Sequence, residues 1–319
     1  MNLKLIFNVI FLCIITLHLN CTSQEVEEQS QEVEESSEKI LIDIGDSLTR
    51  GAGGDGNTMS IATSNLLGTE WIVMNMGVGG ENTLTIGARQ GGLPMYIKES
   101  ITIPKDGSKI EIPTGLYSSY NDKNIHPLIQ GSAGINPCYI GTIECKLSID
   151  KSKSKYFINM ITPQSADCIT KPKSIITTSL SKEKKGIATI FIGQNGGYES
   201  PDDLLNQIDL FVKHKGDENV IIITSHGNGT PETIQPIKEK YQSKHIDLKK
   251  YMSTGAIYDA LEFGLLPNNG EYPTAEDLQR MENNYAPKSL LIDGIHFNPI
   301  GYELLGRLRY KKGKELGYW

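Results

Sequence analysis

The sequence predicts an α/β domain over residues 40–319, built on a parallel, doubly wound sheet. Apolar runs that suit buried strands occur at 40–44, 70–75, 187–193, 219–225 and 245–248. Segments with helical periodicity lie between several of these runs, and strands that alternate with helices pair in parallel. Ligands bind at the carboxyl ends of the strands in such sheets. The residues that follow each strand are therefore the candidates for a functional site.

Residues 1–20 read as a targeting segment. Lys4 is its only charged side chain, and 5–17 is almost wholly apolar, which is too short for a membrane span and suits a signal peptide. Cys21 follows directly, and this arrangement resembles a bacterial lipoprotein signal in which the cysteine is lipidated after cleavage. The alternative is secretion without a lipid. In both cases the mature chain is expected outside the cytoplasm, with membrane contact only through Cys21.

Residues 21–39 predict an acidic tether. The hexapeptide Ser-Gln-Glu-Val-Glu-Glu occurs at 23–28 and again at 30–35, and the segment holds seven Glu with almost nothing apolar. Such a segment repels itself and stays solvated. The net charge of the whole chain is −7, and the first 39 residues account for most of it. The remainder is nearly neutral, so we expect no nucleic-acid partner.

Three of the five cysteines lie in the expected domain, namely Cys138, Cys145 and Cys168. An odd number allows at most one internal disulfide, and Cys138–Cys145 would close a short loop. The sequence contains no C-x-x-C pair or His-x-x-x-His spacing that suggests a metal site, and we predict no cofactor.

The first strand runs into Gly45-Asp46-Ser47-Leu48, a tight turn that carries one hydroxyl. A serine at a strand-to-helix turn is presented at the edge of a sheet, where nucleophiles of other hydrolase folds lie. The alternative is that Ser47 only caps the following helix, since serine is a preferred N-cap residue. This stretch alone does not separate the two interpretations.

Two further strand ends have residues suited to anion stabilisation. The second strand ends in a glycine-rich turn at 75–83, where backbone N–H groups can point at a ligand. Asn195 follows the third strand and can donate its amide to a developing oxyanion. Each feature taken alone is more often a plain turn. Ser47, the glycine-rich turn and Asn195 are all expected at the same edge of the sheet, and their coincidence there favours a functional site.

Four helices are predicted besides the one that ends the chain, at 59–67, 201–215, 252–264 and 274–284. Asp293 and His296 stand three residues apart on a loop before the last helix, for which Asn298 is a good N-cap. An aspartate close to a histidine can hold the imidazole in the tautomer that accepts a proton from a serine.

Four short blocks in this order resemble the SGNH (GDSL-type) hydrolase family: G-D-S-L at 45–48, N-x-G-x-G-G at 75–80, G-x-N at 193–195 and D-x-x-H at 293–296. The resemblance covers 40–92 and 186–319. It implies a three-layer α/β/α sandwich with a mostly parallel, flavodoxin-like sheet. It also implies Ser47 as nucleophile, His296 as general base and acid, and Asp293 as the residue that orients His296.

The same resemblance implies an oxyanion hole. Its donors would be the backbone N–H of Ser47, the backbone N–H of Gly80 and the side chain of Asn195. Because two glycines are adjacent, Gly79 is the alternative to Gly80. The candidate substrate contacts beside these donors are Asp46, Gly79 and His226.

The chain departs from the family pattern at 93–185, where about 90 extra residues alternate in the manner of strands. We expect a small β-rich insertion beside the catalytic face. It could contact substrate, act as a lid or bind a polymer, or serve only as decoration or an oligomer contact.

The expected function is hydrolysis of short-chain esters, with acetyl groups on a carbohydrate as the favoured substrate. The partners are then a small-molecule or polysaccharide ester. A lipase or thioesterase is a second interpretation. A third is a non-catalytic surface protein that binds carbohydrate on a hydrolase scaffold. The sequence does not indicate the oligomeric state.

Overall fold

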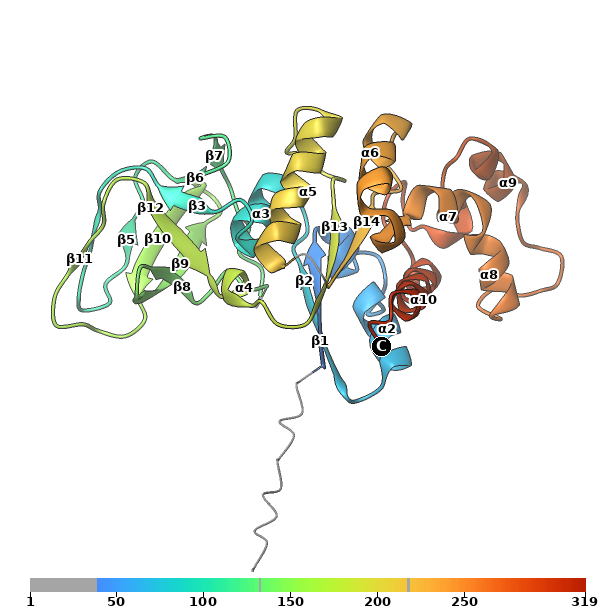
Figure 1. Ribbon diagram of the computed structural model, residues 1–319, viewed down its shortest axis with the longest axis horizontal. Coiled ribbons are helices and arrows are strands. Elements are labelled where there is room, and N and C mark those ends of the chain that lie inside the picture. Colours follow the sequence, from blue (N-terminus) through green and yellow to red (C-terminus); the bar gives the residue numbers. More distant parts are fainter. Residues whose placement is uncertain (1–38, 132, 217–218) are drawn as a thin grey trace, which may run out of the picture. The chain divides into compact units, whose positions relative to one another are not determined.

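The computed structural model describes residues 39–131, 133–216 and 219–319, and Glu38–Trp319 form one compact unit. The unit is a mixed α/β structure that contains a parallel sheet and a large antiparallel sheet (Figure 1). The predicted signal peptide, Cys21 and all of the predicted tether except Lys39 lie outside the described residues. No helix in the described ranges is long and apolar enough to cross a membrane.

The parallel sheet has five strands in the order β15-β14-β13-β1-β2. Its strands are β1 (Lys39–Gly45), β2 (Trp71–Gly77), β13 (Ile187–Ile192), β14 (Val220–Thr224) and β15 (His245–Asp247). All four neighbouring pairs are parallel, as the alternation of strands and helices predicted. The prediction of an α/β fold with a parallel sheet is confirmed.

The register of this sheet brings three strand ends together. Gly45 at the end of β1 lies opposite Gly77 at the end of β2 and opposite Phe191 near the end of β13. The segments that follow these strands therefore leave the sheet at one edge, side by side. Ser47, the glycine turn after Gly77 and Asn195 all belong to these segments.

Different helices cover the two faces of the parallel sheet. Along β13, Ile190 and Ile192 pack into one hydrophobic cluster and Phe191 into another, because alternate side chains of a strand point to opposite faces. The first cluster includes residues of α3 (Thr83–Gln90), α5 (Pro201–Lys215) and α6 (Pro231–Tyr241). The second includes residues of α2 (Met59–Leu67), α7 (Leu248–Thr254), α8 (Ala256–Glu262) and α10 (Pro299–Glu315).

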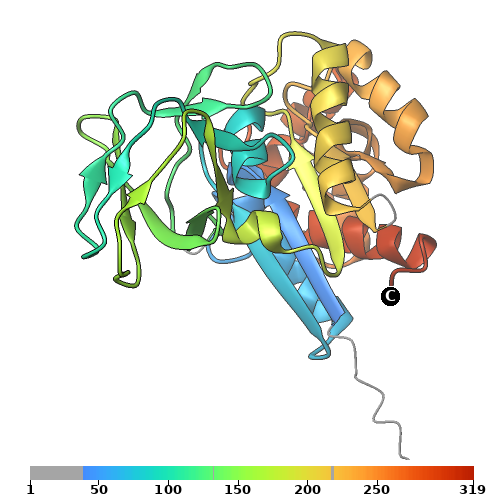
Figure 2. The same ribbon diagram turned by 60° about the vertical axis from the view of Figure 1, so that its left-hand side comes forward.

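The antiparallel sheet comes from the stretch in which a β-rich insertion was expected. It has eight strands in the order β5-β10-β9-β8-β12-β3-β6-β7, and a separate pair is formed by β11 and β4 (Figure 2). Its strands are β3 (Met95–Ile97), β5 (Ile110–Glu111), β6 (Leu116–Ser118), β7 (Asn124–Ile125), β8 (Cys138–Ile140), β9 (Ile143–Asp150), β10 (Lys155–Met160) and β12 (Ser174–Thr178). The separate pair is β4 (Thr102–Ile103) with β11 (Cys168–Ile169).

This antiparallel sheet does not have a hydrophobic core separate from that of the parallel sheet. Leu147 and Ile158 from its strands belong to the same buried cluster as Ile42 and Ile190 of the parallel sheet. Helix α3 contacts both parts, and α4 (Ser179–Lys182) leads from β12 back towards β13. The insertion and the parallel sheet therefore share one hydrophobic core.

Several helices differ from expectation. The helix expected at 252–264 is two helices, α7 and α8, which meet at Gly255, a weak helix former. Helices α1 (Ser47–Arg50), α3 and α6 were not predicted, because short segments with mixed polarity give little periodic signal. Helix α9 (Ala275–Glu282) lies within its expected range.

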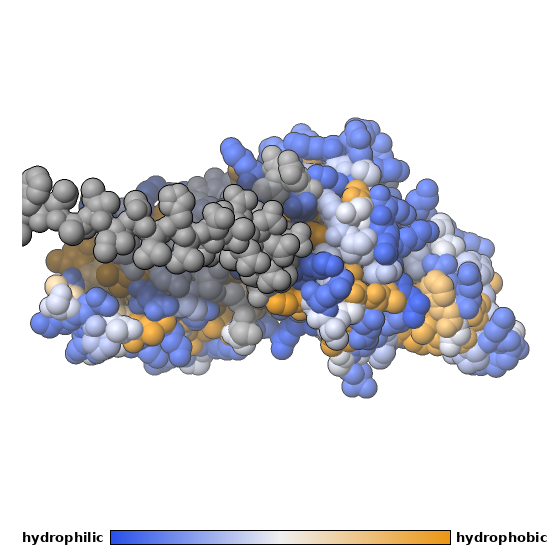
Figure 3. Space-filling model, turned by 60° about the horizontal axis from the view of Figure 1, so that its bottom comes forward, coloured by the Kyte–Doolittle hydropathy of each residue, from blue (hydrophilic) through white to orange (hydrophobic). Residues whose placement is uncertain are grey.

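On the face seen in Figure 3, hydrophobic residues form small patches among polar ones.

The three cysteines that the structure describes form no disulfide. Cys138 and Cys145 lie opposite each other on β8 and β9, yet both are free, as is Cys168. The Cys138 Sγ donates a weak hydrogen bond to the Cys145 carbonyl oxygen, at 3.4 Å, so this thiol is directed at the backbone and not at the opposite sulfur. Burial raises the pKa of Cys138 to about 12, which keeps the thiol protonated and unreactive.

A buried ion pair fastens the last helix to the first strand. Arg309 of α10 pairs with Asp43 of β1, and both side chains are fully buried. The Arg309 Nε also donates to Thr63 Oγ1 at 3.0 Å, and Ser60 Oγ donates to Asp43 Oδ2 at 2.6 Å. The buried carboxylate of Asp43 and the buried guanidinium of Arg309 thus both have hydrogen-bond partners, as burial requires.

We expect Arg309→Met to lower the free energy of unfolding by about 3–5 kcal/mol, because it leaves Asp43 buried without its counter-charge. The matched control is Arg307→Met on the same helix, where the half-exposed arginine pairs with Glu303. The control should cost less than about 1 kcal/mol. Urea unfolding monitored by circular dichroism measures both, and equal losses would contradict this account.

Candidate active site

The turn after β1 presents Ser47 at the sheet edge. Asp46 caps α1 by accepting a hydrogen bond from the Leu48 N–H at 2.9 Å, and Ser47 is the first helical residue. The turn is so tight that a Cβ on Gly45 would lie 2.1 Å from Thr49 Oγ1 and 2.3 Å from the Phe191 carbonyl oxygen. Only glycine fits at this position, which explains the residue before Asp46-Ser47.

Asp293 and His296 stand on a short loop that folds back on itself. Leu291 and Phe297 form a bridge across the loop, and the Ile292 N–H donates to the His296 carbonyl oxygen at 3.0 Å. Asp293 Oδ1 accepts from the Ile295 and His296 N–H groups, each at 2.7 Å. The loop is thus closed by its own hydrogen bonds.

These two segments, about 250 residues apart in the chain, meet through three side chains. His296 Nε2 lies 2.9 Å from Ser47 Oγ, and His296 Nδ1 lies 2.9 Å from Asp293 Oδ2. Since a carboxylate only accepts, Nδ1 carries the proton and Nε2 is free to accept the serine hydroxyl proton. The hydrogen bond from His296 is the main reason that the pKa of Asp293 falls to about 2. The Asp293 carboxylate is therefore ionised at neutral pH.

His226, expected among the candidate substrate contacts, lies beneath this loop. Its Nε2 donates to the Ile295 carbonyl oxygen at 2.8 Å, and its ring packs on Phe297 with centroids 4.6 Å apart. Only 3% of the residue is exposed, and burial lowers its pKa to about 4. His226 is thus neutral and supports the loop from inside. The loop lies between His226 and solvent in this structure, and the expected contact with a substrate stays a prediction.

The glycine turn after β2 faces the serine. The Glu81 N–H donates to the Val78 carbonyl oxygen at 3.3 Å, and Gly80 has φ +85°, a value that favours glycine. A Cβ on Gly79 would lie 3.8 Å from Ser47 Cβ. In the part of the chain that the structure describes, the Gly79 and Gly80 N–H groups donate to no other group. Both amides are therefore available to a ligand.

Gln130, from the connection between β7 and β8, fixes the orientation of this turn. Its Nε2 donates to the Gly79 carbonyl oxygen at 2.9 Å. The carbonyl and the N–H of one trans peptide point in opposite directions, so the Gly80 N–H points away from Gln130. No pattern in the sequence singled out Gln130, because only the fold brings it next to Gly79.

Asn195 also reaches the turn, but its amide already has partners. Its Nδ2 donates to the Glu81 carbonyl oxygen at 2.9 Å and, over a longer 3.4 Å, to Asp46 Oδ2. The structure thus brings Ser47, Gly80 and Asn195 to one edge of the sheet, as expected. The Asn195 N–H that faces Asp46 is the more weakly held of the two.

A buried ion pair holds the glycine turn in place and was missed in the sequence. Glu81 pairs with Arg89 of α3 at 2.9 Å, and both side chains are fully buried. The other Glu81 carboxylate oxygen accepts from the Leu128 N–H at 3.0 Å. A buried arginine cannot be told from an exposed one by residue type, so no sequence signal pointed to this pair.

Asp46, a second candidate substrate contact, is also buried, and its expected contact with a substrate stays a prediction. It is 1% exposed, and its oxygens already accept from Leu48 and Asn195. Burial raises its pKa from 3.8 to about 6. Asp46 is therefore a buried capping residue whose charge is held at some cost to stability.

In the described ranges, no group of three or more His, Cys, Asp or Glu side chains is arranged to hold a metal ion. No family model matches the chain, and neither a curated protein nor a solved structure matches it.

We expect His226→Leu to speed amide hydrogen exchange in residues 291–297, because the Ile295 carbonyl loses its donor and the loop loses its support. His226→Gln retains an N–H donor and should leave the exchange rates close to those of the wild type. Hydrogen exchange followed by mass spectrometry, with near-ultraviolet circular dichroism of each variant, separates loop support from misfolding. Equal protection of this loop in the Leu variant and the wild type would contradict this role.

The raised pKa of Asp46 predicts a pH-dependent stability. Between pH 4 and pH 6 the folded protein binds more protons at this site than the unfolded chain, so its contribution to the free energy of unfolding falls as pH rises. Asp46→Asn removes this dependence. Between pH 4 and pH 7 the free energy of unfolding of the variant should therefore rise by about 2 kcal/mol relative to that of the wild type, whatever the difference between the two proteins at pH 4. Urea unfolding across this range tests it, with the exposed Asp55→Asn as control. If the free energies of unfolding of Asp46→Asn and the wild type differ by the same amount at every pH, the raised pKa of Asp46 is contradicted.

Proposed function

We propose that this protein is a serine ester hydrolase that uses Ser47, His296 and Asp293 as its catalytic triad. The observation that carries the proposal is the pair of 2.9 Å contacts that link Ser47 Oγ to His296 Nε2 and His296 Nδ1 to Asp293 Oδ2. A nucleophile within hydrogen-bond reach of a base, with the base oriented by a third group, is the arrangement that activates a serine.

The reaction would proceed in two steps. Ser47 Oγ attacks the ester carbonyl carbon while His296 Nε2 takes the hydroxyl proton, and His296 then returns this proton to the leaving alcohol oxygen. Water attacks the resulting acyl-serine as His296 removes its proton, and the acid leaves as Ser47 is reprotonated. Asp293 stays ionised and stabilises the imidazolium in both steps.

The negative charge of the tetrahedral intermediates would be stabilised by the Ser47 N–H, the Gly80 N–H and the Asn195 side chain, with Gly79 as the alternative to Gly80. The unused glycine amides beside Ser47 support this assignment. Asn195 would exchange its 3.4 Å contact with Asp46 for the oxyanion and keep its bond to Glu81. Loss of one such donor typically lowers kcat by about 10²–10³.

Membership of the SGNH (GDSL-type) hydrolases is part of the proposal. The four sequence blocks meet at one sheet edge, and in chain order the parallel strands are arranged 2-1-3-4-5, the order of flavodoxin-like sheets. The helices on both faces of that sheet support a three-layer α/β/α arrangement for this part of the chain.

We propose short acyl esters, acetyl esters of carbohydrates above all, as the substrate class. Two apolar side chains are exposed on the loop that carries Asp293 and His296, namely Ile292 and Ile295. Together they offer a small apolar surface, which suits a short acyl group. The signal-like start and Cys21 support a site of action outside the cytoplasm, with or without a lipid anchor. A lipase or thioesterase, and a carbohydrate-binding protein without activity, are the alternatives that the following test addresses.

Ser47→Ala is expected to lower kcat/KM on 4-nitrophenyl acetate by about 10⁵-fold or more, and Asp293→Asn by about 10³–10⁴-fold, because the imidazole then loses its oriented tautomer. The exposed Ser243→Ala serves as control and should match the wild type. Rates on the acetate, butyrate and octanoate esters and acetate release from acetylated polysaccharides define the substrate.

Highest activity on the octanoate ester would favour the lipase interpretation. A folded wild type without activity on any of these esters would overturn the proposal in favour of a binding protein. Activity that persists in Ser47→Ala would show that another group is the nucleophile.

A further inference from the structure

Arg50 places a positive charge next to the nucleophile. It ends α1, three residues after Ser47, so both side chains leave neighbouring positions of one helical turn. A Cβ on Gly79 would lie 3.6 Å from Arg50 Nη1 and 3.8 Å from Ser47 Cβ. The guanidinium and the serine thus approach the same glycine of the proposed oxyanion turn.

This charge is uncompensated. Arg50 is exposed, and within the described ranges no carboxylate lies at ion-pair distance from it. Its one hydrogen bond goes from Nη1 to the neutral Gln130 Oε1, so four of the five guanidinium N–H groups have no protein partner there. The nearby acids are engaged elsewhere, since Glu81 pairs with Arg89 and Asp46 accepts from Leu48 and Asn195.

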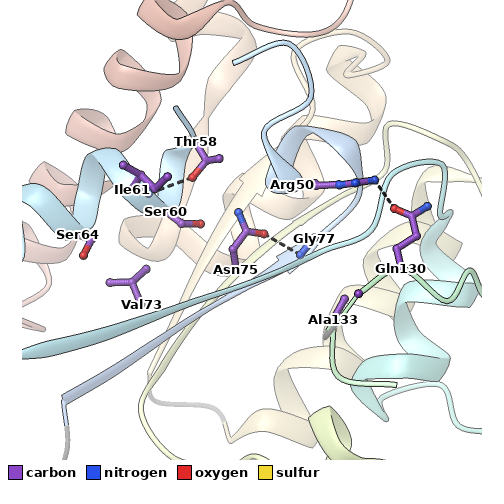
Figure 4. A pocket seen from close by; sticks show the side chains of 11 residues that line it. Arg50, Thr58, Ser60, Ile61, Ser64, Val73, Asn75, Gly77, Gln130 and Ala133 are labelled. Carbon is purple, nitrogen blue, oxygen red and sulfur yellow. Dashed lines mark hydrogen bonds between the residues drawn. The ribbon is translucent and has the colours of Figure 1, made fainter. Parts of the chain in front are cut away.

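Arg50 also borders a cavity of about 460 Å³, which is within the range of ligand sites. Figure 4 shows Arg50 and Gln130 on one side of the cavity and Thr58, Ser60 and Ser64 on the other, with Asn75 between them. The lining therefore combines hydroxyl and amide groups with the apolar side chains of Ile61, Val73 and Ala133. Among the described residues that line the cavity, Arg50 alone is charged, which favours a ligand with a negative charge.

We propose that Arg50 binds a carboxylate of the ester substrate, so that the enzyme prefers esters that carry a carboxylate near the scissile bond. This inference rests on the proposed esterase function. A guanidinium matches a carboxylate in planar, bidentate geometry, and its single charge balances one monoanion. The Gln130 Oε1 accepts a hydrogen bond from Nη1, and the other N–H groups of the guanidinium remain available to a carboxylate. The carboxylate belongs either to the acyl group, as in a dicarboxylic half-ester, or to the alcohol, as in an acetylated sugar acid.

The test compares two pairs of esters. In the first pair the acyl group differs, with mono-4-nitrophenyl succinate against 4-nitrophenyl butyrate. In the second pair the alcohol differs, with 4-acetoxybenzoate against its methyl ester. Each pair gives a preference, defined as kcat/KM for the charged ester divided by kcat/KM for the neutral one. Dividing the wild-type preference by that of a variant cancels differences in intrinsic reactivity and any loss that both esters share.

Arg50→Gln should lower the preference in at least one pair by about 10–100-fold, the effect of losing a charge-assisted bidentate contact. Arg50→Lys keeps the positive charge but loses the planar, bidentate geometry, so its preference should lie between those of the wild type and Arg50→Gln. Lys311→Gln removes an exposed charge on α10 and should leave both preferences unchanged. A loss confined to the first pair assigns the carboxylate to the acyl group, and a loss confined to the second assigns it to the alcohol.

Unchanged preferences in Arg50→Gln, with hydrolysis that depends on Ser47, would overturn this inference and leave the proposed function intact. A folded wild type that hydrolyses none of the four esters would overturn the proposed function and this inference together.

Discussion

The geometry around Ser47 depends on the buried side chain of Arg89. Its guanidinium donates to Glu81 in the glycine turn, to the Met76 carbonyl at the end of β2 and to the Ala133 carbonyl from the insertion. A longer contact of 3.4 Å reaches the Gly45 carbonyl at the end of β1. A charge buried this completely is stable only when its donors are satisfied, so the groups around it have little freedom to move. One side chain thereby fixes the two strand ends and the turn that meet at the candidate site.

The insertion is part of this arrangement and not an appendage. Leu128 and Ala133 bind the Glu81–Arg89 pair through their backbones, and Gln130 sets the orientation of the Gly79–Gly80 peptide. Together with the shared hydrophobic core, these contacts make the site a joint product of both sheets. The same segment also brings Gln130 to Arg50, whose Nη1 donates to the Gln130 Oε1 at the edge of the site.

Two aspartates near the serine have opposite pKa shifts, and the contrast fits opposite duties. Asp293 is half exposed and accepts three hydrogen bonds, which lower its pKa to about 2 and keep it ionised. Asp46 is buried, and the loss of hydration raises its pKa to about 6. The first suits a residue that must stay negative beside an imidazolium. The second suits a cap whose task is to shape the turn that presents Ser47.

The sequence by itself determined the local features of this protein. Strand and helix periodicity placed β1, β13, α2, α5 and α10 closely, because long apolar patterns and good caps such as Asn298 act within a few residues. The order of the four blocks indicated Ser47, Asp293 and His296 as partners. Only the tertiary structure decided what surrounds them. It placed His226 beneath the loop of His296 and buried Asp46 in the turn before Ser47, and long-range packing brought Gln130 and Arg89 to the glycine turn. Burial and contacts between distant segments depend on how whole elements pack, and residue types along the chain do not encode them locally.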